Sequence, residues 1–100
     1  MHVAKGQFRV SRAAKQDLLR IGRFTERRWG KAKRNQYLGQ LNQAIALIAE
    51  NDSIGKICDE ISEGYRKFPE GSHVIYYRVT DMVEIIRILH ERMDPDSYLS

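Results

Sequence analysis

Apolar residues in the first half of the chain recur at the spacing of an α-helix. Between residues 12 and 29, and again between 31 and 50, they fall three or four positions apart with charged residues on the other side. These apolar stripes are Ala14, Leu18, Ile21, Thr25 and Trp29, then Leu38, Leu41, Ile45 and Ile48. Gly30 lies between the stretches, where a left-handed glycine commonly ends a helix. We therefore expect two antiparallel helices joined by a short turn.

The pattern changes to that of β-strands on both sides of this hairpin. Residues 7–10 alternate apolar and polar side chains, and Ser11 after them has the side chain of a helix N-cap. Three later segments are rich in β-branched and aromatic residues, namely 64–68, 72–79 and 82–90. The last segment is apolar on both alternating faces, which predicts a central strand covered by the helices.

Turn-forming residues mark the joints between these elements. Asn51-Asp52-Ser53 ends the second helix, Phe68-Pro69-Glu70-Gly71 is predicted to be a turn, and Thr80-Asp81 suits a tight hairpin. Residues 94–98 begin a short terminal turn or helix. The order β-α-α-β-β-β predicts an α+β domain, with the helical hairpin packed on one face of a small, mainly antiparallel sheet.

Length and composition fit one globular domain over residues 1–100. The chain is 42% hydrophobic and 30% charged, and Cys58 is the single cysteine. Its longest apolar runs are far shorter than the roughly 20 residues of a membrane span, and the N-terminus lacks a secretory signal. We therefore expect a cytoplasmic protein without membrane contact. Cys58 is expected to be an ordinary small apolar residue.

Positive charge is concentrated in the first half. Residues 1–50 hold 11 Lys and Arg against 3 Asp and Glu (+8), while residues 51–100 hold 6 against 10 (−4), which gives the net charge of +4. The basic excess lies mostly on the expected helices, at Arg20, Arg23, Arg27, Arg28, Lys31, Lys33 and Arg34. Such a face is either simply solvated or meets an acidic protein or nucleic-acid phosphate, and composition leaves these alternatives open.

Motifs for catalysis or cofactor binding do not occur in the sequence. It contains no glycine-rich nucleotide-binding loop, and His2, His73 and His90 lie far apart without metal-ligand spacing. We therefore expect no catalytic residue, no metal and no other cofactor.

A set of basic residues remains on the expected strands. Arg66, Arg78 and Arg87 could converge on the sheet face away from the helices and hold a phosphate or carboxylate there. The alternative is structural ion pairing with Asp59, Glu60, Glu63 and Glu84. We expect the tyrosines to pack in the core or its rim, and His90 to be a hydrogen-bonded structural residue.

Several segments form a distinctive series along the chain. They are residues 8–14 with Asp17-Leu18, Thr25-Glu26-Arg27-Arg28-Trp29-Gly30, Tyr37-Leu38, Ala49-Glu50-Asn51, residues 64–69, residues 71–79, and residues 83–90 with Arg92-Met93-Asp94. This series resembles the ParE branch of the RelE/ParE toxin superfamily over nearly the whole chain. The fold of that family is also β-α-α-β-β-β.

The resemblance implies the toxin of a bacterial type II toxin–antitoxin pair, neutralised by a ParD-like antitoxin. ParE-like toxins act on DNA gyrase by binding, so the resemblance implies a toxin that is not an enzyme, and no direct sequence-specific DNA binding is expected. The alternative is the RelE function, a ribosome-dependent mRNA endoribonuclease. Arg92 and Tyr98 lie where RelE-type toxins place an arginine and a tyrosine. However, His73 replaces their usual arginine, and residues 54–63 carry a single lysine, Lys56.

Two groups of residues are the expected contacts. We expect an acidic and apolar antitoxin tail to bind the hairpin and the sheet edge through Arg20, Arg23, Arg27, Trp29, Arg66, Arg78 and Arg87. We expect the gyrase target to bind the stretch from Arg87 to Leu99, whose polar and aromatic tips are not needed for the core. Its contact residues are expected to be His90, Arg92, Met93 and Tyr98.

Overall fold

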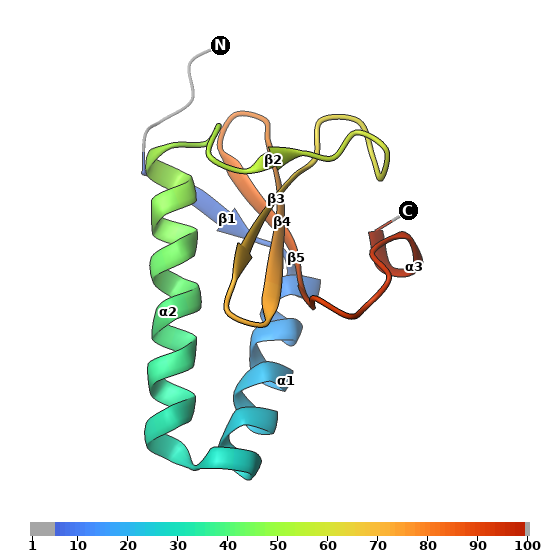
Figure 1. The fold of residues 1–100 in the computed structure, drawn as a ribbon. Coiled ribbons are helices and arrows are strands. Elements are labelled where there is room, and N and C mark those ends of the chain that lie inside the picture. The colour runs from blue at the N-terminus through green and yellow to red at the C-terminus, as the bar shows by residue number, and fades with distance from the viewer. Residues whose placement is uncertain (1–5, 100) are drawn as a thin grey trace.

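Two long helices cover one face of a five-stranded sheet. The computed structural model describes residues 6–99, so His2 lies outside the described residues. The elements in chain order are β1 (Phe8–Val10), α1 (Arg12–Trp29), α2 (Lys31–Glu50), β2 (Lys56–Ile57), β3 (Arg66–Glu70), β4 (His73–Val79), β5 (Val83–His90) and α3 (Asp96–Leu99), as drawn in Figure 1. The predicted α+β class and the hairpin packed on a sheet are confirmed.

Local capping sets the bounds of the two helices. The Ser11 side chain accepts a hydrogen bond from the Ala14 N–H at 3.0 Å and donates one to the Ile86 carbonyl at 2.7 Å, which both starts α1 and ties it to β5. Gly30 has φ of +93° and separates α1 from α2, a backbone angle that glycine adopts without steric cost. Both predicted helices are confirmed from end to end.

The strand order is β1-β5-β4-β3-β2, with β1 parallel to β5 and the other neighbours antiparallel. The strand that is apolar on both faces, β5, therefore lies inside the sheet, between β1 and β4, as predicted. Strand β2 was not predicted; it consists of two residues paired with Arg66 and Lys67 of β3. Two residues are too few to show a periodic pattern.

The predicted turn at residues 68–71 is wrong. Strand β3 continues through Pro69, which is paired with Val74, and the turn lies after Glu70, where Gly71 has φ of +58°. Strand β2 pairs with β3 only at Arg66 and Lys67, so the β3 edge beside Pro69 has no neighbouring strand among the described residues. Proline is tolerated there because its lack of an N–H costs no hydrogen bond between strands.

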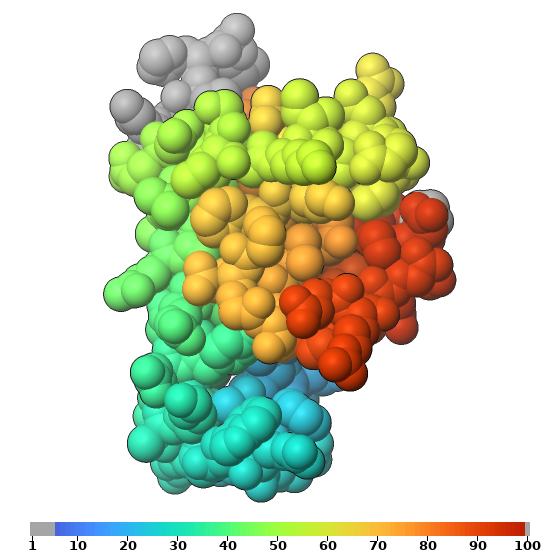
Figure 2. All heavy atoms as spheres, viewed as in Figure 1, coloured from blue at the N-terminus to red at the C-terminus, as the bar shows by residue number. Residues whose placement is uncertain are grey.

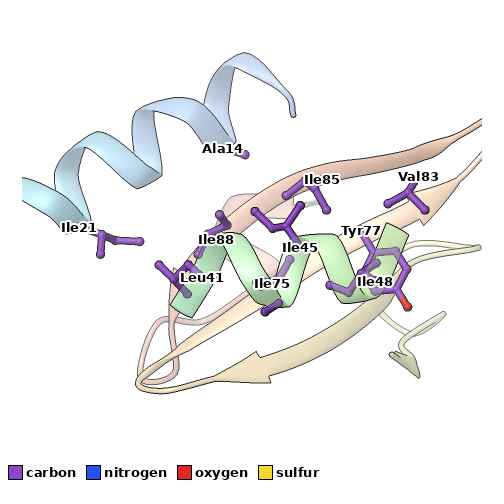
Figure 3. Packing of buried hydrophobic residues seen from close by; sticks show 11 residues of the cluster. Ala14, Ile21, Leu41, Ile45, Ile48, Ile75, Tyr77, Val83, Ile85 and Ile88 are labelled. Carbon is purple, nitrogen blue, oxygen red and sulfur yellow. The ribbon is translucent and has the colours of Figure 1, made fainter. Parts of the chain in front are cut away.

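The main core lies between the hairpin and the sheet (Figure 3). Its buried members are Ala14, Ile21, Leu41, Ala44, Ile45, Ile48, Ile75, Tyr77, Val83, Ile85 and Ile88. The buried Tyr77 hydroxyl is fully used, because it accepts from the Gly55 N–H and donates to the Asp52 carbonyl, each at 2.8 Å. Trp29 was predicted on the apolar stripe, but it is 59% exposed because the hairpin tip projects past the sheet (Figure 1).

A second, smaller core lies on the opposite face of the sheet. Cys58, Tyr76 and Leu89 are its buried members, and Tyr76 alternates with Tyr77 of the main core along β4. The loop after β2 covers this second core with Ile61 and Tyr65, and the chain end covers it with Met93 and Leu99. Figure 2 shows these two segments side by side over the sheet. Cys58 is the buried apolar residue that was predicted, and burial raises the pKa of its thiol.

Candidate functional site

The second half of α1 exposes both cations and aromatic rings. We call it the basic hairpin face, and it consists of Arg20, Arg23, Phe24, Arg27, Arg28 and Trp29. Trp29 meets Phe24 edge to face with ring centroids 6.1 Å apart, and the Arg28 guanidinium lies 5.7 Å from the Trp29 ring centre. Within residues 6–99, Arg23 and Arg27 form no ion pair. Their charge is therefore available to a partner.

Four of the predicted antitoxin contacts, Arg20, Arg23, Arg27 and Trp29, are exposed on α1. Arg20, Arg23 and Arg27 share the charged side of the helix, whereas Trp29 lies at the end of its apolar stripe. Phe24 was missed, although it is 54% exposed and contacts Trp29. The sequence did contain a signal for Phe24. It lies four residues from both Arg20 and Arg28, and therefore on the charged side of an amphipathic helix, where an aromatic ring is exposed.

The predicted convergence of Arg66, Arg78 and Arg87 is wrong, because each has acceptors in its own neighbourhood. Arg66 donates to the Gly55 carbonyl at 2.7 Å and the Ser53 carbonyl at 3.3 Å. Arg78 pairs with Glu84 at 2.7 Å, which confirms the ion-pair alternative for that residue. Arg87 turns instead toward helix α1.

The acceptor of Arg87 is Asp17, a buried carboxylate on α1 with 2% exposure. Arg87 donates to it twice, from Nε at 2.8 Å and from Nη2 at 2.9 Å, and the Ile88 N–H donates at 2.9 Å. The exposed Arg20 also bonds this carboxylate. The hydrogen bonds that Arg87 donates to Asp17 raise the pKa of Arg87, so the guanidinium keeps its charge.

Sequence reasoning missed Asp17 as a structural partner. It lies three residues after Ala14 and four before Ile21, and so falls on the apolar stripe of its helix. A buried carboxylate needs a charged or hydrogen-bonding partner, so an aspartate at that position already indicated an ion pair.

The residues predicted to meet the target lie at the end of β5 and beyond it. The Tyr98 ring lies 5.5 Å from the Arg87 guanidinium and is 45% exposed. Arg92 is exposed, and its N–H donates to Nδ1 of His90 at 3.1 Å, so His90 is hydrogen-bonded as predicted. Only the polar and aromatic tips of this stretch were expected to be unnecessary for the core, and its apolar residues Met93 and Leu99 pack against the second core.

His73 and His90 are distant in sequence but lie opposite each other on β4 and β5. Their ring centroids are 5.3 Å apart, and the Tyr37 hydroxyl lies 2.6 Å from Nδ1 of His73. Burial, with His90 as the second cause, lowers the pKa of His73 to about 4, so this imidazole is neutral near pH 7. Within residues 6–99, no three His, Cys, Asp or Glu side chains gather to form a metal site. None of the helices in this range is long and apolar enough to span a membrane.

Comparisons with known proteins agree with this architecture. Residues 8–95 match the family described as the ParE toxin of the type II toxin–antitoxin system parDE. Toxin ParE1 of Mycobacterium tuberculosis is 44% identical over 93% of this chain and 97% of its own length, and Toxin ParE1 of Caulobacter vibrioides is 41% identical over 92% and 96%. Toxin ParE of Escherichia coli is 34% identical over 81% of each chain.

A solved structure shares the fold at low sequence identity. It is titled "Chromosomal ParDE TA system from P. aeruginosa" and aligns with a TM-score of 0.74 and 17% identity, covering 84% of this chain and 94% of that chain. The match of the family to residues 8–95 and the near-full-length relatives lead to one conclusion. The chain belongs to the ParE family and is the toxin of a type II toxin–antitoxin system.

Proposed function

We propose that this toxin inhibits DNA gyrase by binding and is neutralised by a ParD-like antitoxin. The observation that carries the antitoxin half is the basic hairpin face, where Trp29 is 59% exposed beside Arg28, which forms no ion pair within residues 6–99. Tryptophan and arginine dominate the binding energy of protein interfaces. An acidic segment with apolar side chains is the complement of this surface.

The gyrase half rests on family membership together with a second exposed surface at the end of the chain. Arg92 and Tyr98 are exposed there, and they lie on other elements than the basic hairpin face. Mutations can therefore separate the two contacts. We do not propose the ribonuclease alternative, because His73 is neutral and cannot supply the cationic stabilisation of a phosphate that the missing arginine would give.

The antitoxin contact is testable by calorimetric titration of the toxin with a ParD-like antitoxin. Trp29→Ala should weaken binding by about 30-fold or more, as expected for a central aromatic anchor. Arg27→Glu should also weaken binding, while Lys56→Glu on the exposed strand β2 makes the same charge change elsewhere and should have little effect. Equal losses for Arg27→Glu and Lys56→Glu, or no loss for Trp29→Ala, would contradict this surface.

The target is testable with purified gyrase in DNA supercoiling and DNA cleavage assays. We expect loss of supercoiling with accumulation of cleaved DNA, relieved when the antitoxin is added. A correctly folded toxin that leaves gyrase fully active would overturn the gyrase half. A ribosome-dependent mRNA cleavage assay would then test the alternative.

A further inference from the structure

The C-terminal segment, residues 93–99, is attached to the sheet by side chains at both of its ends. Met93 and Leu99 pack against the second core, and the Tyr98 ring lies over the Arg87 guanidinium at 5.5 Å. Its helix α3 has only four residues, too few to be stable alone. The orientation of this segment therefore depends on its contacts with the rest of the molecule.

We propose that Asp17 and Arg87 are positioning residues that hold Tyr98, and with it the C-terminal segment, in the orientation that meets the target. This inference rests on the proposed function, in which that segment binds gyrase. Neither positioning residue needs to touch the target, because both act through the face of the Tyr98 ring. Figure 2 shows the segment on the surface of the molecule, where a partner can reach it.

The geometry of Arg87 fits this role. Two hydrogen bonds from Nε and Nη2 to the two carboxylate oxygens of Asp17 fix the plane of the guanidinium. The side chain of Arg87 is only 16% exposed, so a target has little access to it. A fixed guanidinium attracts the electron-rich face of an aromatic ring, which selects one position for Tyr98.

Asp17 is in turn held by burial and by a further hydrogen bond. Its side chain is 2% exposed, and the Ile88 N–H donates to it at 2.9 Å from the edge of β5. A carboxylate on α1 thus determines, through one arginine, how a segment about eighty residues later lies on the sheet. Tyr98 itself is 45% exposed, so part of its ring contacts Arg87 and part is free to meet a partner.

Cys58 offers a readout of this arrangement that does not require gyrase. Its thiol is fully buried in the second core, which Met93 and Leu99 cover. Detachment of the C-terminal segment should expose the thiol to an aromatic disulfide reagent. We expect Tyr98→Leu and Arg87→Lys to raise the reaction rate by about two- to five-fold, the factor that a cation–π contact of this kind supplies.

Conservative variants separate this mechanism from a general loss of structure. Tyr98→Phe keeps the aromatic face and should react at the rate of the unmodified protein. Arg9→Lys makes the same change at an exposed arginine, which is paired with Glu84, and should also have no effect. Urea unfolding of each variant identifies any rate increase that comes from global instability. An unchanged thiol rate in Tyr98→Leu would overturn the proposal.

The functional consequence is measured as the toxin concentration that halves gyrase supercoiling. Arg87→Lys should raise this concentration in the otherwise unmodified toxin, but should add little once Tyr98→Leu is present, because both changes break one contact. Independent, multiplicative effects of the two changes would overturn the positioning role. If the unmodified toxin does not inhibit gyrase, the proposed function fails, while the thiol rates still decide whether Arg87 holds the segment.

Discussion

Acidification should destabilise this protein through one imidazole, that of His73. The ring lies between the Tyr37 hydroxyl, 2.6 Å from Nδ1, and the ring of His90. Burial and His90 lower the pKa of His73 from 6.5 to about 4, although the charges of Asp17 and Glu91 act in the opposite direction. The folded protein therefore resists a proton that the unfolded chain accepts.

The sign and size of the effect follow from linkage. His73 contributes stability above pH 6.5, where both states are neutral, and loses it as the pH falls toward about 4, where the folded state is also protonated. Each pH unit within that window costs about 1.4 kcal/mol, so a change from neutral pH to about pH 5 should remove roughly 2 kcal/mol of unfolding free energy.

Urea unfolding at neutral pH and at about pH 5 checks this value. His73→Gln keeps a polar side chain but cannot gain the proton, so it should lose about 2 kcal/mol less than the unmodified protein over the same interval. Tyr37→Phe removes the hydroxyl and leaves the ring in place, and it should keep most of the pH dependence because burial is the main cause. Parallel losses in the unmodified protein and His73→Gln would refute the reasoning.

Two further substitutions test other parts of the fold by urea unfolding. Asp17→Asn should lower the free energy of unfolding by about 3 kcal/mol or more, because it removes the charge that balances the partly buried Arg87. A loss below about 1 kcal/mol would contradict the role given to this pair. Gly55→Ala should lower the free energy of unfolding by about 1–3 kcal/mol, because the added Cβ would lie 2.6 Å from the ring of the buried Tyr77. As a control, the Cβ added by Gly39→Ala on α2 meets no atom within 4 Å, so this variant should be neutral or stabilising.

Much of the fold could be predicted because its signals are local. The 3.6-residue spacing of α1 and α2, the capping side chain of Ser11 and the β-branched runs of β4 and β5 each lie within one short segment. The strand boundaries that were predicted wrongly depend on the neighbouring strands of the sheet. Pro69 continues a strand because its side of β3 is open, and that is a property of the sheet and not of the residues around the proline.

The candidate site was predicted in part for the same reason. The cations of the basic hairpin face lie on one helix, so their spacing alone places them together. The partner of Arg87 was sought among carboxylates in the second half of the chain, but it is Asp17, which is 70 positions away. Trp29 fitted the apolar spacing of α1, yet the stripe continues past the end of the sheet, and the spacing does not reveal where the sheet ends.

The parallel pairing of β1 with β5 has a consequence for how the chain folds as it is synthesised. Phe8 pairs with Val83, so β1 must wait for a strand that is synthesised 75 residues later. The two helices contact each other locally and can form while translation continues, but the sheet beneath them cannot close until β5 has emerged from the ribosome. We therefore expect the sheet to close only once residues 83–90 are free to pair, and nascent chains that stop before Val83 should hold a helical hairpin whose apolar stripe is still uncovered.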